Sequence, residues 1–206
     1  MNEIKLPSKF LDNAVRQLAK LPGVGNRTAL RLALHLLNQS EEDIHLFSNS
    51  LIELKEQTCF CQKCFNISDQ EICEICANPY RDQSLVCVVE SIKEVMAIEF
   101  TQQFRGVYHV LGGVISPIDG IGPQQLKIEE LVQRISEGNI KEIIFALSTT
   151  MEGDTTNFFI HKKIKDSGVN TSMLARGVSV GDSLEYADQL TLGRSIINRM
   201  PYQANL

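Results

Sequence analysis

The second half of the chain alternates between short apolar runs and stretches in which apolar residues recur at helical spacing. The runs that predict strands lie at 85–90, 107–111, 143–147 and 169–174. Helical patterns separate them: one spans 91–100, one carries Leu126, Leu131, Val132 and Ile135, and one ends near Asp166. Continuous apolar runs of this length are typical of strands that are buried on both faces. The repeated alternation therefore predicts an α/β fold, with a parallel sheet flanked by helices on both faces.

The first 57 residues show helical patterns alone. A first helix has Ser8 as its N-cap and buries an apolar stripe. The stripe consists of Phe10, Leu11, Ala14, Val15 and Leu18. Pro22 ends this helix, and Asn26 is the expected cap of a second helix at 26–37.

A third helix is predicted after Ser40, which has Asp43 three residues on and so resembles a capping box. Its apolar residues are Ile44, Phe47, Leu51 and Leu54. Because they recur at helical spacing, we expect a buried stripe that packs on the first two helices.

Two C-x-x-C pairs lie between these halves. They are Cys61-Gln-Lys-Cys64 and Cys73-Glu-Ile-Cys76, with eight residues between them. Each pair forms a knuckle that bends the backbone so that two thiolates face one point, and together they supply the four sulfur ligands of a closed structural zinc site. A metal would also supply folding energy to a segment too short for a core of its own. The alternatives are a redox C-x-x-C motif or two disulfides, both of which fit the context less well.

Composition narrows the classes of protein. No apolar run approaches the length of about 18 residues needed for a membrane-spanning helix, so no membrane partner is expected. The N-terminus lacks the apolar stretch of a signal peptide, and six cysteines in that context predict a cytoplasmic protein that binds metal. Cys87 lies in an apolar run and is expected in the core. Cys59 could compete for the metal, although Cys59-x-Cys61 fits a knuckle less well, so its role stays open.

The charge is distributed unevenly. Residues 1–40 carry six basic and two acidic side chains, a net charge of +4, so the rest of the chain carries −9 of the total of −5. A basic head on an acidic body is the distribution expected of a protein that touches nucleic acid with one part of its surface.

The segment Leu21-Pro-Gly-Val-Gly25 joins the first two helices and offers a phosphate-binding arrangement. Gly23 and Gly25 leave backbone N–H groups uncovered beside the positive end of the next helix. Arg27 and Arg31 lie four residues apart on one face of that helix, within reach of neighbouring phosphates. The pattern resembles a helix-hairpin-helix motif, which grips the DNA backbone without reading its sequence. The alternative is an ordinary helical corner with solvated arginines.

Three carboxylates follow predicted strands. Glu90 ends the first strand, and Glu152 and Asp154 come after the third, in what we expect to be an extended loop. Ligands gather beyond the carboxyl ends of parallel strands, and three carboxylates there could hold Mg²⁺. Alternatively they serve the starts of helices, where negative charge is favourable. The pattern resembles the Toprim fold of topoisomerases and primases, although Glu152-Gly-Asp154 departs from Asp-x-Asp.

Several longer segments add to these motifs. They are Cys87-Val-Val-Glu90, Tyr108-His-Val-Leu-Gly-Gly113, Ser116-Pro-Ile-Asp-Gly-Ile-Gly-Pro123, Ala175-Arg-Gly177, Gly181 and Leu184-Glu-Tyr-Ala-Asp188. In combination with the glycine hairpin and the four cysteines, they resemble the RecR family of bacterial recombination mediators over nearly the whole chain. The resemblance implies a helix-hairpin-helix domain at 1–57, a four-cysteine zinc finger at 58–78, a Toprim domain at 84–179 and a C-terminal helical tail at 180–206.

The resemblance implies a DNA-binding clamp and adaptor in recombinational repair, with no catalytic activity. Proteins of this family form rings of four subunits around DNA, and Arg27 and Arg31 would line the hole. With RecO and RecF they load the recombinase on gapped single-stranded DNA, so the implied partners are single- and double-stranded DNA, RecO, RecF and further copies of the chain. The acidic positions would contact RecO and DNA. The implied location is the cytoplasm, in association with the nucleoid.

The alternative function is a Mg²⁺-dependent Toprim enzyme that acts on DNA phosphodiesters. Such an enzyme needs an activated nucleophile beside the metal if it forms a covalent link, or more acidic ligands than these three if it uses two metals. No tyrosine of the chain is accompanied by residues that mark it as a nucleophile.

Overall fold

The computed structural model describes residues 6–181 and 183–201, which divide into two compact units between Thr58 and Cys59. We call them the N-terminal unit and the C-terminal unit. In the described part of the chain, no helix is long and apolar enough to cross a membrane.

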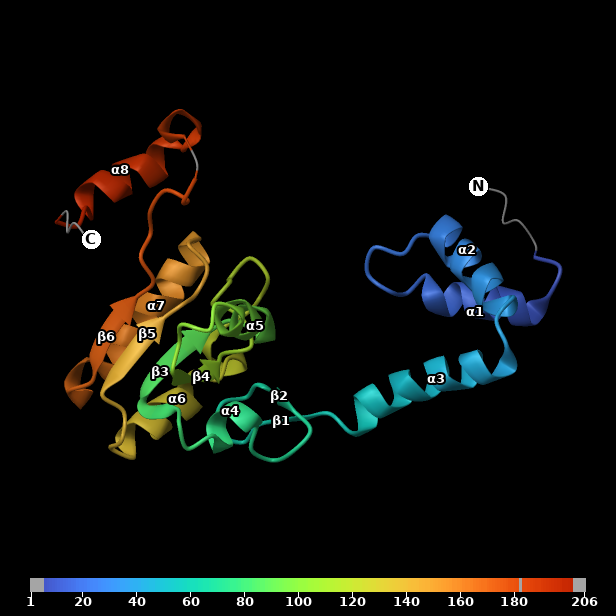
Figure 1. The fold of residues 1–206 in the computed structure, drawn as a ribbon, viewed down its shortest axis with the longest axis horizontal. Helices are drawn as coiled ribbons and strands as arrows, with labels where there is room; N and C mark the ends of the chain where they lie inside the picture. Colours follow the sequence, from blue (N-terminus) through green and yellow to red (C-terminus); the bar gives the residue numbers. More distant parts are fainter. Residues whose placement is uncertain (1–5, 182, 202–206) are drawn as a thin grey trace. The chain divides into compact units, whose positions relative to one another are not determined.

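The N-terminal unit contains three helices, α1 (Lys9–Leu18), α2 (Asn26–Leu37) and α3 (Glu41–Glu56) (Figure 1). Ser8 caps α1 as expected, because its hydroxyl oxygen accepts hydrogen bonds from two backbone N–H groups of the first turn. The small core between α1 and α2 is built on Val15, Ala29 and Ala33. The prediction that Asn26 caps α2 was wrong. Gly25 occupies the cap position, and Asn26 is the first residue of the helix.

The third helix begins after Ser40 as predicted, with the Asp43 N–H donating to the Ser40 hydroxyl at 3.1 Å. The prediction of a buried stripe on this helix was wrong. No residue of α3 is buried, and Phe47, Leu51 and Leu54 are 46%, 53% and 64% exposed. The apolar spacing is present, but the described chain folds nothing over it.

The C-terminal unit begins with a small four-cysteine segment (residues 59–78). It holds β1 (Cys59–Phe60) and β2 (Ile67–Ser68), which pair antiparallel, and the single-turn helix α4 (Glu74–Ala77). The chain then enters a parallel sheet in the order β4-β3-β5-β6. Its strands are β3 (Asp82–Val89), β4 (Gly106–Val110), β5 (Glu142–Phe145) and β6 (Asn170–Met173). The predicted parallel sheet is confirmed.

Helices cover both faces of the sheet, as predicted (Figure 1). They are α5 (Ile92–Phe100), α6 (Ile128–Ser136) and α7 (Met151–Ile164). Alternate strand residues point to opposite faces. Val86 and Val88 therefore pack with α6 and α7, while Cys87 and Val89 pack with α5. Cys87 is 2% exposed, which confirms its expected place in the core.

The remaining elements are short. Three 3₁₀ turns, η1 (Pro123–Gln125), η2 (Lys165–Ser167) and η3 (Leu184–Tyr186), precede or follow the helices, and α8 (Gln189–Ile197) is the last helix described. Asp188 caps α8, because its side chain accepts a hydrogen bond from the Thr191 N–H at 2.9 Å.

The start of α7 depends on close contact with the loop that follows β5. An added Cβ on Gly153 would lie 2.0 Å from the backbone oxygen of Ser148, far inside van der Waals contact. Replacing Gly153 with alanine should therefore lower the free energy of unfolding by about 1–3 kcal/mol, the usual cost of overpacking. Urea unfolding followed by circular dichroism measures this.

Gly193→Ala is the matched control, since Gly193 is also helical and an added Cβ there meets nothing within 4 Å. It should leave stability unchanged or raise it by up to about 1 kcal/mol. Equal stability of the two variants would show that the start of α7 is not tightly packed.

Candidate metal centre and nucleic-acid interface

Four cysteine side chains gather at one buried point of the C-terminal unit. Cys61, Cys64, Cys73 and Cys76 are between 0% and 5% exposed, and their sulfur atoms all lie within 4.8 Å of one another. Among the described residues they are the one group of three or more His, Cys, Asp and Glu side chains close enough to hold a metal ion. The structure thus brings together all four cysteines of the predicted zinc set.

Backbone hydrogen bonds explain how the first C-x-x-C pair folds. The Phe65 N–H donates to the Cys61 carbonyl at 2.9 Å, and the Cys61 N–H donates to the Asn66 carbonyl at 2.8 Å. Phe65 adopts a φ of 62°, which turns the chain sharply after Cys64. Both sulfurs of the pair are buried and belong to the group of four.

The second pair is shaped by a helix start. Cys73 is the N-cap residue of α4, and the Ala77 N–H donates to the Cys73 carbonyl at 2.9 Å. The Cys73 N–H in turn donates to the sulfur of Cys61 at 3.3 Å. This bond crosses between the pairs and turns the two knuckles toward the same point.

Burial and hydrogen bonds shift the pKa values of the thiols in different directions. Burial raises the pKa of the Cys61 thiol, but N–H groups of Cys73, Cys64 and Lys63 stabilise its thiolate and bring the pKa down to about 7. Burial raises the pKa of Cys73 to about 11, and a hydrogen bond to Cys76, followed by burial, raises the pKa of Cys64. Four thiolates this close repel one another unless a cation lies between them. Four buried sulfur ligands with no open position fit a structural zinc ion.

Cys59 lies outside this group. It is on β1, and its thiol donates hydrogen bonds to the carbonyls of Ser68 at 3.2 Å and Gln70 at 3.1 Å. A thiol that donates to backbone oxygens is held away from the other sulfurs. Cys59 therefore stabilises the β1–β2 turn.

The four-cysteine segment is hydrogen-bonded to an edge strand of the parallel sheet, β4. The Val110 N–H at the end of β4 donates to the carbonyl of Cys64 at 2.8 Å. The Phe65 ring meets the ring of the buried His109 edge-on, with centroids 5.4 Å apart. A hydrogen bond from the Arg134 guanidinium to the Tyr108 carbonyl at 2.7 Å fixes α6 over the same strand. The first knuckle thus covers the outer strand of the sheet.

The glycine hairpin of the N-terminal unit leaves a helix start open. Gly23 has a φ of 76°, in the left-handed region that favours glycine, and the turn brings Gly25 to the N-cap of α2. No side chain caps α2, so the N–H groups of its first turn have no side-chain acceptor. The helix start is thus open beside the two glycines, although the sequence had also suggested a cap by Asn26.

Arg27 and Arg31 lie on the exposed surface of α2, one turn apart. All ion pairs between described residues involve other side chains, so both guanidinium groups are available to a ligand. Two such arginines beside an uncapped helix start form a surface that suits phosphate groups.

The predicted acidic cluster is arranged differently from what we expected. β3 and β5 are neighbours, as the hypothesis required. However, Glu152 and Asp154 lie in the first turn of α7 and not in an extended loop, because Thr150 caps the helix early by accepting from the Gly153 N–H at 3.2 Å.

Two of these carboxylates already have protein partners. The Glu90 carboxylate accepts a hydrogen bond from the Ser148 N–H, and Asp154 forms an ion pair with Arg176. The Arg176 guanidinium holds the pKa of Asp154 below its usual value. Sequence reasoning missed Arg176, although the Ala175-Arg-Gly177 segment marked the position.

All three acidic positions lie within the described residues. Glu90, Glu152 and Asp154 do not form a group close enough to hold a metal, and the structure gives no support for Mg²⁺ there. The arrangement fits the alternative, in which carboxylates serve helix starts and loops.

If the four cysteines hold zinc, removing one ligand should release the metal. Cys73→Ser is expected to lose bound zinc and to lower the melting temperature by about 10 °C, from a loss of about 3 kcal/mol. Elemental analysis gives the zinc content per chain, and calorimetry gives the melting temperature.

Cys59→Ser is the control, because the Cys59 thiol is bonded to backbone carbonyls and lies outside the sulfur group. It should retain one zinc ion per chain. Full zinc content in Cys73→Ser, or loss of zinc from Cys59→Ser, would contradict the assignment of the ligands.

Comparison with known families assigns each part of the chain. Residues 11–55 match the RecR helix-hairpin-helix model, and 58–78 match the RecR zinc finger domain with four cysteine ligands. Residues 84–175 match the Toprim domain, and 177–200 match the RecR C-terminal model. The metal centre thus lies in a four-cysteine zinc finger, and the parallel sheet in a Toprim domain.

Relatives match over almost their whole length. The Recombination protein RecR of Bacteroides thetaiotaomicron is 62% identical over 199 residues, which is 97% of each chain. That of Flavobacterium psychrophilum is 58% identical over 200 residues, again 97% of each chain. That of Porphyromonas gingivalis is 58% identical over 198 residues, 96% of each chain. With matches of this identity and coverage, and with the helix-hairpin-helix, zinc-finger and C-terminal models of one family aligned in order, the chain belongs to the RecR family of recombination proteins.

Proposed function

We propose that this chain is a non-catalytic DNA clamp and adaptor in recombinational DNA repair. It acts with RecO and RecF to load the recombinase on gapped single-stranded DNA, in the cytoplasm and in association with the nucleoid. The relatives' shared name supports the role in recombination. The observation that carries the DNA-binding part is the pair of exposed arginines, outside every ion pair of the described residues, beside the uncapped start of α2.

The DNA contact is to phosphate groups. An N–H cluster at a helix start and two guanidinium groups one turn apart suit the charged oxygens along a strand. Binding is therefore independent of sequence, because phosphate contacts position a protein without specifying bases. This suits both single- and double-stranded DNA.

A single copy of the chain makes few such contacts, and its net charge is −5. Several copies arranged in a ring bring several arginine pairs to one DNA molecule, which raises their effective concentration. The exposed apolar stripe of α3 supports such self-association, since Phe47, Leu51 and Leu54 are about half exposed or more within one copy. Apolar side chains in a row are stabilised when a second copy covers them. We propose a ring of four subunits that encircles DNA.

The competing function, a Mg²⁺-dependent Toprim enzyme, lacks the required arrangement. A nuclease or topoisomerase needs carboxylates free to hold a metal beside the scissile phosphate. Here Glu90 is bonded to the backbone of Ser148, and Asp154 is paired with Arg176. The Toprim domain serves as a scaffold and a docking surface for RecO.

The test of the DNA contact is the double variant Arg27→Ala with Arg31→Ala. Because it removes two phosphate contacts per subunit, we expect loss of measurable DNA binding at moderate salt, with zinc content and melting temperature unchanged. Fluorescence anisotropy with labelled DNA of two unrelated sequences should show the same loss for both.

The matched control is Lys162→Ala with Lys165→Ala, which removes the same charge from exposed positions of the C-terminal unit. It should bind DNA nearly as the unaltered chain does. Normal affinity in the arginine variant would show that the hairpin is only a structural corner.

Catalysis is tested directly. Because two of the three carboxylates are engaged with protein partners, incubation of supercoiled plasmid with the chain and Mg²⁺ should yield no nicked or relaxed product. Gel electrophoresis measures this. Nicking that disappears in Glu152→Ala would restore the enzyme hypothesis.

A further inference from the structure

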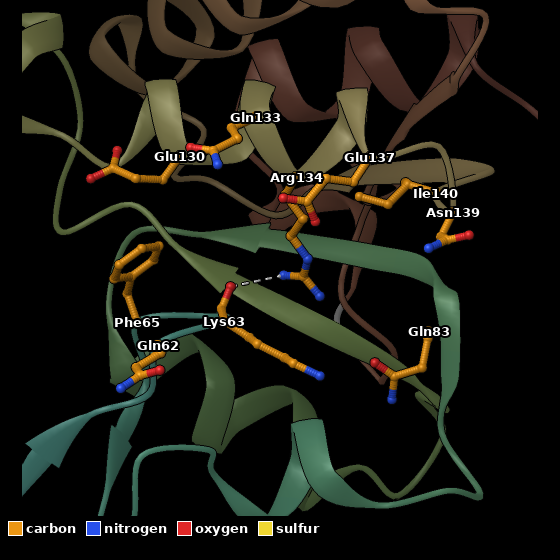
Figure 2. A pocket seen from close by; sticks show the side chains of 10 residues that line it. All are labelled: Gln62, Lys63, Phe65, Gln83, Glu130, Gln133, Arg134, Glu137, Asn139 and Ile140. Atoms are coloured by element: carbon orange, nitrogen blue, oxygen red, sulfur yellow. Dashed lines mark hydrogen bonds between the residues drawn. The ribbon is translucent and has the colours of Figure 1, made fainter.

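A polar cavity lies between the zinc finger and α6, with a volume of about 500 Å³. The zinc finger contributes Gln62, Lys63 and Phe65, and α6 contributes Arg134 among others (Figure 2). All lining residues belong to the C-terminal unit. The volume falls within the range of sites that bind small ligands or a few residues of a peptide.

A fixed cation lies at this cavity. The Arg134 guanidinium donates through Nη1 to the Tyr108 carbonyl at 2.7 Å. It also donates, more weakly, to the Lys63 carbonyl at 3.4 Å (Figure 2). These bonds hold its plane and leave the other N–H groups free. Among the described residues, no carboxylate lies within ion-pair distance of Arg134 or of the Lys63 ammonium. A partly buried guanidinium without a carboxylate is stabilised when an anion binds.

The rest of the lining limits what that anion is. Glu137, also without a cation partner among the described residues, lies just beyond α6 beside Arg134, and Glu130 lines the same cavity. The lining thus holds two cations and two anions, and Glu130 is already paired with Lys127 at 2.9 Å. The C-terminal unit as a whole carries 13 basic and 18 acidic side chains. A DNA backbone needs an excess of positive charge, so a polyanion is disfavoured.

The uncharged lining residues suit a peptide. Four amide side chains line the cavity, and amides both donate and accept, as a peptide backbone requires. They are Gln62, Gln83, Gln133 and Asn139. The Phe65 ring and the Ile140 side chain supply a small apolar surface.

We propose that this cavity binds an Asp- or Glu-bearing peptide segment of a partner protein. Arg134 and Lys63 hold the carboxylate, the amide side chains bind the peptide backbone, and Glu137 selects a basic residue next to the carboxylate. The site uses residues of the C-terminal unit alone, so its test does not depend on the DNA contact proposed for the N-terminal unit.

The test uses ligand-observed saturation-transfer NMR on the full zinc-loaded chain. The probe is the blocked peptide acetyl-Lys-Glu-Lys-amide, and the matched probe replaces its glutamate with glutamine. We expect binding of the first peptide and a Kd at least about tenfold higher for the second, the usual effect of losing a charge-assisted hydrogen bond. Equal binding of the two peptides, or no binding of either, would overturn the proposal.

Variants of the chain locate the binding. Arg134→Gln and Lys63→Gln should each raise the Kd of the glutamate peptide, whereas the exposed Lys162→Gln should not. Lys63→Gln decides the outcome if Arg134→Gln fails to fold, because it leaves both backbone bonds of Arg134 in place. Unchanged Kd in both variants would place the peptide elsewhere and overturn the proposal.

Glu137 separates a peptide from a simple anion. Glu137→Gln should weaken the lysine-flanked peptide and strengthen binding of inorganic phosphate, because it removes a negative charge that attracts lysine and repels phosphate. A competition experiment on the unaltered chain gives the other outcome. If phosphate and an oligothymidine displace the peptide and bind with a lower Kd than the peptide does, the cavity is a nucleic-acid site and the proposal is wrong.

Discussion

As thiolates, four sulfur atoms buried within 4.8 Å of one another need a cation among them, and the contact between the zinc finger and the parallel sheet is built around this constraint. The carbonyl of Cys64 accepts the Val110 N–H at the end of β4, which is the outer strand of the sheet. An outer strand with open N–H groups is a site of unwanted pairing, and here the turn that carries the sulfur ligands occupies it. A metal held there would order the loop that contacts the end of this strand.

The contact between the zinc finger and β4 also fixes the positions of Phe65 and His109. Phe65 follows a ligand and carries a positive φ, and its ring packs on His109 in the strand. The His109 Nε2 lies 2.7 Å from the Lys127 carbonyl just before α6, and burial lowers the pKa of His109 to about 4. A neutral imidazole thus stays in the core at ordinary pH, because charging it would cost too much desolvation. The zinc finger, β4 and α6 pack against one another, and the polar cavity lies between the zinc finger and α6.

Charge is divided between the two units according to their contacts. The glycine hairpin brings Arg27 and Arg31 to a helix start that has no side-chain cap, so the protein itself leaves positive groups unsatisfied there. By contrast, the carboxylates of Glu90 and Asp154 in the Toprim domain are engaged by Ser148 and Arg176. Carboxylates whose charges are already compensated are poor metal ligands.

The sequence by itself determined the features that depend on local patterns, and only the tertiary structure decided which distant groups meet. Cysteine spacing defined the set of four sulfurs, because two C-x-x-C turns have few ways to fold. Gly23 defined the turn before α2, since only a glycine readily takes its φ of 76°, but the sequence did not show that Asn26 would leave this helix uncapped. By contrast, apolar spacing along α3 predicts a buried stripe but cannot show whether another surface covers it.

The carboxylates of Glu90 and Asp154 follow strands as metal ligands do. They are instead bound by Ser148 and Arg176, through contacts 58 and 22 residues apart in sequence. Such pairings form because tertiary packing brings residues that are distant in sequence close together. The free energy that favours them comes from the packing of the whole unit and not from any local sequence pattern.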